Sequence, residues 1–279
     1  MKIIRALKTV NYRLWLAILA TMLLPTIYQT VRIYFLGEMP NDSGVNIASQ
    51  LQWVNLLYEV VHEALILPLF FLLGKSLNDK KEFTNKVRTG LVVTAFVYML
   101  ISLVIIVFAR PIVLLMAQNV HLVDDTVTYI RLETIAAIFS ALWKFTTTVM
   151  ISLKKDRYIY ILLSVQMLTS VLLDTFLVSN LPVSAKLGVN GIALTNIAVN
   201  VMILTLALVL LQREHISLFV KEKWNYSWLA EWFKVGSYSG LESLLRNFAF
   251  MMMVIRMVNI VAEQGNYWIA NNFIWQWLW

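Results

Sequence analysis

The chain has no cysteine among its 279 residues. Disulfides, iron–sulfur clusters and thiolate metal sites are therefore excluded. Charged residues are also scarce, because Asp, Glu, Lys and Arg together make up 14% of the sequence. A Gly-rich phosphate loop, a metal-ligand spacing and a Ser/His/Asp arrangement are all missing. We therefore expect neither an enzyme nor a resident metal or other cofactor.

Apolar residues dominate what is present. They make up 59% of the chain, which includes 10 Trp, and a soluble domain of this length would aggregate with such a composition. Apolar runs of about 20 residues, the length needed to cross a bilayer, recur along the chain. They predict an all-α polytopic membrane protein with seven spans and a shorter eighth segment: Leu14–Gly37, Val45–Gly74, Gly90–Leu115, Val127–Leu153, Tyr158–Ser179, Val189–Leu211, Ser237–Val261 and Tyr267–Trp279.

Basic residues alternate from one connection to the next. Almost all the Lys and Arg between the predicted spans lie before the first span or in the even-numbered connections, and the other side has only Lys186. The positive-inside rule then places the N-terminus and the even-numbered connections in the cytoplasm. We expect the protein to lie in the plasma membrane. Basic loops at an anionic leaflet account for most of the net charge of +7, so the expected partner is membrane lipid and not nucleic acid.

The sixth connection divides the chain. Residues 1–211 are predicted to form an N-terminal six-helix bundle, 212–235 a cytoplasmic basic linker, and 236–279 the start of a second, truncated bundle. Trp224, Trp228 and Trp232 could place a short amphipathic helix of the linker in the membrane interface. The final segment has 13 residues, which is too short to span.

Several segments, taken together and in order, resemble the MATE (multidrug and toxic compound extrusion) family of transporters: Leu73–Lys80, Leu153–Asp156, Leu172–Leu177 with Asp174, Leu187–Thr195, and Val235–Gly236. The resemblance implies two six-helix bundles around a central cavity and alternating access coupled to H⁺ or Na⁺. It implies an antiporter that exports organic solutes or drugs. This chain would supply the N-terminal bundle and the beginning of the second, with the rest of the second bundle missing.

Basic residues inside the apolar runs are the candidates for the cavity. A cation at the centre of a spanning helix costs about 2.5–3.5 kcal/mol, so it is retained where it meets a partner or lines a wet cavity. Arg110 and Arg131 lie close enough to the outer interface to snorkel. The remaining substrate-cavity candidates are Arg32, Lys144, Arg246 and Arg256.

Acidic residues at matching depths are the candidates for ion or proton coupling. Glu59, His62 and Glu63 fall at i, i+3 and i+4 on one helix face, where two carboxylates in a low dielectric would not both ionise. Counting along the helices places them in one layer with Lys144 and Arg246, so a salt-bridged latch is the alternative interpretation. A second layer holds Arg32, Arg256, Glu133 and Asp174, of which Asp174 is the coupling residue that the resemblance carries over.

Two positions depart from the resemblance. Arg32 lies near a place where many family members have an acidic residue, and Arg246 near one where some members do, so the cavity here is more cationic. A cationic cavity favours an anionic ligand. The alternative function is therefore a flippase-like carrier of an anionic lipid-linked substrate, as found in the wider superfamily. A non-transporting fragment is the second alternative.

Overall fold

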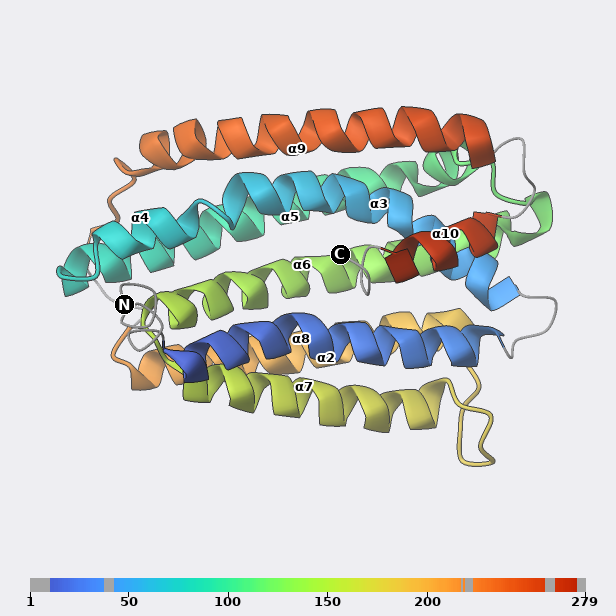
Figure 1. Ribbon diagram of the computed structural model, residues 1–279, viewed down its shortest axis with the longest axis horizontal. Helices are drawn as coiled ribbons and strands as arrows, with labels where there is room; N and C mark the ends of the chain where they lie inside the picture. The colour runs from blue at the N-terminus through green and yellow to red at the C-terminus, as the bar shows by residue number, and fades with distance from the viewer. Residues whose placement is uncertain (1–10, 38–42, 217, 219–222, 259–263, 275–279) are drawn as a thin grey trace, which may run out of the picture.

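The structure is a computed structural model that describes residues 11–37, 43–216, 218, 223–258 and 264–274 (Figure 1). The described part of the chain is helical and contains no β-strand. Its helices are α2 (Tyr12–Gly37), α3 (Ser43–Leu65), α4 (Leu69–Lys75), α5 (Lys80–Leu115), the short 3₁₀ helix η2 (Val120–Leu122), α6 (Val123–Ser152), α7 (Asp156–Leu177), α8 (Gly188–Arg213), α9 (Leu229–Val258) and α10 (Gln264–Phe273).

Six helical segments of the described chain are long and apolar enough to cross a membrane: Tyr12–Ile33, Ser43–Lys75, Lys80–Leu115, Val120–Ser152, Asp156–Leu177 and Gly188–Arg213. The all-α, multi-pass membrane architecture expected from the sequence is confirmed. The predicted seventh span exists as α9, which has 30 residues but is not among the six. The eighth segment contains α10, which has 10 residues.

Helix α6 lies in the middle of the bundle. In Figure 1 it runs between a layer containing α3, α5 and α9 and a layer containing α2, α7 and α8. Its side chains pack most extensively against α8 and α5. Helix α10 crosses the gap between α2 and α3, where the Trp268 ring meets the Trp53 ring edge-on at 5.3 Å between centroids. The bundle is thus organised around α6, with polar side chains from several helices turned toward the space beside it.

The second predicted helix, Val45–Gly74, is broken in the structure. Helix α3 ends at Leu65 and α4 begins at Leu69, because Pro68 has no N–H to donate and its ring clashes with the carbonyl four residues before it. The Leu67 and Leu69 amides bond to His62 and Ile66 instead of continuing the α-helical pattern. Within the described residues, the three consecutive carbonyls of Glu63, Ala64 and Leu65 at the end of α3 are consequently left without a backbone donor.

Proline has a different effect in the other spanning helices. Helix α2 continues through Pro25 without a break. Helix α5 bends at Phe108, which has φ −96° and ψ 15°, three residues before Pro111. Pro25 and Pro68 therefore affect their helices differently, and of these two only Pro68 separates two helices.

Helix α9 begins earlier than the sequence predicted, at Leu229 instead of Ser237. The predicted interfacial helix of the linker is wrong for the residues described, because Trp228 and Trp232 are buried in the bundle. Their rings stack 4.8 Å apart, and their indole N–H groups donate to Thr89 Oγ1 and to the Leu65 carbonyl. A buried indole needs such an acceptor, and the bundle supplies it where a membrane interface would have supplied water.

Helix α9 covers the carbonyls that lack a backbone donor because of Pro68. Besides Trp232 at the Leu65 carbonyl, Ser239 Oγ donates to the Glu63 carbonyl at 2.7 Å. Gly236 approaches the third carbonyl, that of Ala64, so closely that a Cβ at Gly236 would lie 2.1 Å from its oxygen. Gly236 and Gly240 form a G-x-x-x-G pair, which lets helix backbones meet in a membrane. We call this contact the α3–α9 seam.

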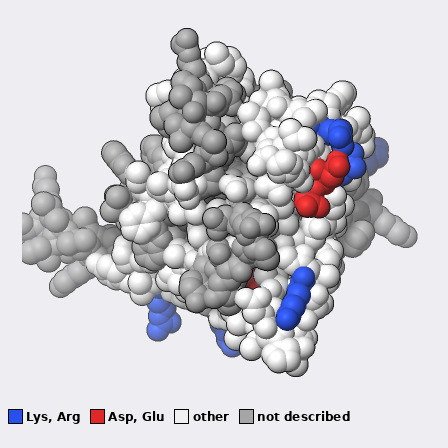
Figure 2. All heavy atoms as spheres, turned by 90° about the vertical axis from the view of Figure 1, so that its right-hand side faces the viewer, with Lys and Arg blue, Asp and Glu red and all other residues white. Residues whose placement is uncertain are grey.

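The two ends of the bundle differ in their charged residues. The end at the left of Figure 1 carries the connections α4–α5, α6–α7 and α8–α9, and we call it the basic end. Here Lys155 Nζ lies 2.7 Å from Glu214 Oε2 and Tyr158 donates to Oε1, and these two hydrogen bonds hold the pKa of Glu214 below its ordinary value. The opposite end shows few described charges (Figure 2), among them the Arg110–Asp124 ion pair.

Candidate functional site

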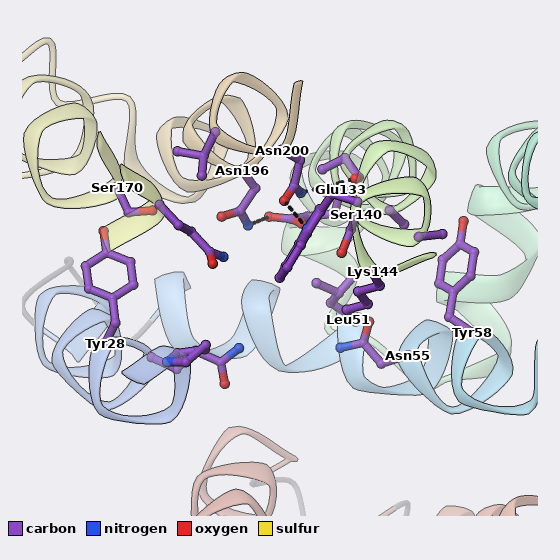
Figure 3. A pocket seen from close by; sticks show the side chains of 18 of the residues that line it. Tyr28, Leu51, Asn55, Tyr58, Glu133, Ser140, Lys144, Ser170, Asn196 and Asn200 are labelled. Carbon is purple, nitrogen blue, oxygen red and sulfur yellow. Dashed lines mark hydrogen bonds between the residues drawn. The ribbon is translucent and has the colours of Figure 1, made fainter. Parts of the chain in front are cut away.

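A cavity of about 570 Å³ lies inside the bundle. Every one of the six membrane-length segments contributes at least one lining residue, so the cavity is central to the bundle and not a surface groove of one helix pair. In Figure 3, Tyr28 and Ser170 lie on one side of it and Tyr58 on the other, with Asn55, Glu133, Lys144 and Asn196 between them. A polar wall at the depth of spanning helices is typical of a passage for a solute or ion.

A buried ion pair of the cavity joins α2 to α7. Arg32 Nε and Nη2 donate to the two carboxylate oxygens of Asp174 at 2.7 and 3.2 Å, and both side chains are buried, with exposed fractions of 12% and 7%. The Tyr28 hydroxyl donates to the same carboxylate, and its ring lies below the Arg32 guanidinium. A two-pronged pair of this kind fixes the orientation of both groups.

Asn196 of α8 connects this pair to a second carboxylate. Arg32 Nη1 donates to Asn196 Oδ1 at 2.7 Å, and Asn196 Nδ2 donates to Glu133 Oε1 at 2.7 Å. Glu133 is 7% exposed, and in Figure 3 the Asn196 amide points toward it. A single guanidinium therefore serves two buried carboxylates, Asp174 directly and Glu133 through an amide. We call these four residues with Tyr28 the Arg32 network.

Lys144 lies in the same cavity without a counter-ion. Among the described residues, no carboxylate is within salt-bridge distance of its ammonium group. The predicted latch between Lys144 and the acidic residues of α3 is therefore not formed. His62 also lines the cavity, and its Nδ1 is buried with no hydrogen-bond partner in the described structure. The cavity thus offers one free cation and one free imidazole nitrogen.

Three of the remaining predicted site residues, Arg246, Glu59 and Glu63, meet at the α3–α9 seam. Arg246 contacts Glu63 at 2.5 Å, Glu242 at 2.8 Å and Glu59 at 3.1 Å, so the alternative prediction of a salt-bridged latch to Arg246 is confirmed. Of these acidic residues only Glu59 lines the cavity. We call this cluster of one guanidinium and three carboxylates the Arg246 network. Its Arg246, Glu59 and Glu242 side chains are about half-exposed or more.

Depth counting along the helices grouped most of these residues correctly. It predicted Arg32, Asp174 and Glu133 in one layer and Arg246, Glu59 and Glu63 in the other. It left Tyr28 and Asn196 out, although both are polar groups inside apolar runs, which is the signal that would have identified them. Arg256 lies in α9, and its side chain is outside the described part of the chain.

No group of three or more His, Asp or Glu side chains in the described residues is arranged to hold a metal ion. No family model, curated protein or solved structure matches the chain. The function therefore has to be argued from the cavity itself.

Proposed function

We propose that the protein is a secondary transporter of the plasma membrane that moves an organic solute through the central cavity by a MATE-like, cation-coupled antiport. The observation that carries this proposal is the cavity of about 570 Å³ that all six membrane-length segments line and that holds ionisable groups at helix mid-depth. Its volume is in the range of small-molecule sites. Buried charges at this depth are costly unless they serve a pathway.

The Arg32 network supports coupling to protons. Asp174 and Glu133 depend on the same guanidinium, and Arg32 can offset only one negative charge. Two buried carboxylates beside one cation favour a proton on one of them. Both oxygens of Asp174 already accept protein donors, which leaves little room for a Na⁺ ion. Proton binding and release at Glu133 and Asp174 would therefore change the charge of the cavity between its two access states.

The test is transport in proteoliposomes under a proton or Na⁺ gradient, with a panel of cationic and anionic dyes. Glu133→Gln and Asp174→Asn are expected to abolish proton-driven uptake while uptake by simple exchange persists. Glu242→Gln is the matched control, because Glu242 is an exposed carboxylate outside the cavity. Absence of transport under both gradients would contradict the proposal and favour the non-transporting alternative.

A flippase-like carrier of an anionic amphiphile is the second candidate, and the free ammonium of Lys144 is the observation that favours it. A cation that lines the cavity with no carboxylate partner among the described residues attracts an anion into it. If this candidate holds, Lys144→Gln removes transport of an anionic amphiphile and leaves that of a cationic dye unchanged. Retained transport of the anionic amphiphile would exclude this second candidate.

The proposal also includes the orientation of the protein in the membrane. The basic end carries the even-numbered connections and would face the cytoplasm, with the N-terminus on the same side. Reporter fusions in the α6–α7 and α7–α8 connections are expected to report opposite sides of the plasma membrane. The reverse assignment would overturn the proposed direction.

A further inference from the structure

A second hollow lies at the basic end, away from the central cavity. It is a shallow groove of about 500 Å³ between the start of α2 and the first turns of α7. Arg13 and Arg157, each the second residue of its helix, line it together with Asp156. The Tyr160 hydroxyl donates to the Arg13 carbonyl at 3.0 Å and so ties the two helix ends together. The groove shares no lining residue with the central cavity.

The two arginines of this groove form no ion pair with the described residues of the protein. Three other basic residues at the same end form ion pairs: Lys75 with Glu231, Lys86 with Glu82, and Lys155 with Glu214. Neither Arg13 nor Arg157 has a carboxylate within salt-bridge distance in the described structure, although Asp156 lies in the same groove. Two guanidiniums against one carboxylate leave the groove with a surplus positive charge.

The lining changes from charged to apolar along α7. Ile161 and Val165 follow Arg157 at one and two turns, and Ser164 supplies a hydroxyl between them. Val165 is about 12 Å deeper than Arg157 at about 1.5 Å per residue, which takes the groove from the headgroup region into the hydrocarbon layer. Leu168 and Leu172 continue the exposed apolar surface below. A ligand that fits this gradient has an anionic head and an apolar tail.

We propose that this groove binds the headgroup of an anionic phospholipid, with Arg13 and Arg157 at the phosphodiester and an acyl chain along Ile161, Val165 and Leu168. Guanidinium groups bind phosphate oxygens in a forked geometry. Basic pockets between spanning helices at an anionic leaflet are suited to such headgroups. The proposal needs only that the chain is embedded in a membrane, so it does not depend on transport.

The experiment counts lipids bound to the detergent-purified protein by native mass spectrometry, with phosphatidylglycerol and phosphatidylcholine of equal chain length as probes. The variant is Arg13→Gln with Arg157→Gln, and the matched control is Lys80→Gln with Lys81→Gln, two exposed residues at the same end with the same change in charge. Each basic group near an anionic surface strengthens binding by about fivefold, so the arginine variant is expected to bind phosphatidylglycerol about 25-fold more weakly.

The lysine control is expected to stay within about twofold of the wild type, because its side chains lie outside the groove. Arg13→Lys with Arg157→Lys keeps the charge and is expected to retain most of the binding, which separates loss of charge from misfolding. Equal losses in the glutamine and lysine-control variants, equal binding of the two lipids, or displacement by millimolar inorganic phosphate would each overturn the proposal.

Discussion

The protein holds two arginines by different means. Arg32 of α2 bonds to Asn196 of α8 and faces Asp174 of α7 in a two-pronged pair, with the Arg32 and Asp174 side chains 12% and 7% exposed. Arg246 lies on the α3–α9 seam with a side chain 47% exposed and gathers three carboxylates. Arg32 therefore bonds directly to one carboxylate, whereas Arg246 bonds directly to three.

The surroundings decide what each arginine does. A buried pair is costly to break, because the partner that remains is an uncompensated charge in a low dielectric. A half-exposed cluster in contact with water has solvent as an alternative partner, so each contact contributes little. The Arg32 network should therefore contribute to the stability of the fold as well as to the charge of the cavity. Substitutions in the Arg246 network should have little effect on stability.

The largest effect is expected from Arg32→Gln. It leaves Asp174 buried without its cation, and the free energy of unfolding should fall by about 3–5 kcal/mol. Denaturant titration in mixed micelles measures it. The double variant with Asp174→Asn removes both charges and should recover much of the loss. If Arg32→Gln is as mild as Arg246→Gln, the contrast between the two networks fails.

Gly236→Ala tests how much of the seam depends on backbone contact and not on charge. The new Cβ would lie 2.1 Å from the Ala64 oxygen, so α9 must move, with an expected loss of about 1–3 kcal/mol. The same titration measures it. Gly74→Ala is the matched control, since a Cβ there meets nothing within 4 Å and the change should be neutral or stabilising. Equal effects at the two glycines would contradict the close approach.

Arg246→Gln should cost less than about 1 kcal/mol, because its side chain and those of Glu59 and Glu242 are about half-exposed or more. The loss should shrink further in high salt. Stability measured at two ionic strengths checks both statements. A loss as large as that expected for Arg32→Gln, with no salt dependence, would show that this face of α9 is shielded from water.

The smallest effect on stability is expected at the partly exposed Lys155–Glu214 pair, which serves as a reference for the larger effects above. Because the pKa of Glu214 is lowered in the folded protein, its stabilising contribution is present above the ordinary Glu pKa and is lost as pH falls through the folded value. Stability should therefore fall by a few tenths of a kcal/mol between about pH 5 and 3. Glu214→Gln should remove this step and Lys155→Gln should reduce it, because Tyr158 still donates to Glu214 in the second variant. A step that persists in Glu214→Gln would come from other carboxylates.

The sequence was sufficient to predict the spanning helices, because a run of about 20 apolar residues is rarely found outside a membrane span. Depth counting also grouped Arg32 with Asp174, which lie 142 positions apart, since helix rise is constant. It could not decide which residues on a layer face one another, so Lys144 was grouped with acids that it does not contact. Depth counting also could not tell that the helix breaks at Pro68 and continues through Pro25. A helix breaks at proline only where the carbonyls that lose their backbone donor find other donors.

Those donors arrive late in synthesis. Glu63 and Leu65 leave the ribosome 176 and 167 residues before Ser239 and Trp232, the side chains that bond to their carbonyls. At about 5–20 residues per second this interval is roughly 10–30 s, during which the end of α3 has only water or a temporary neighbour as a partner. The end of α3 is therefore synthesised early but gains these hydrogen bonds only when α9 docks, so the folding of the second membrane segment is completed by a helix from the C-terminal part of the chain.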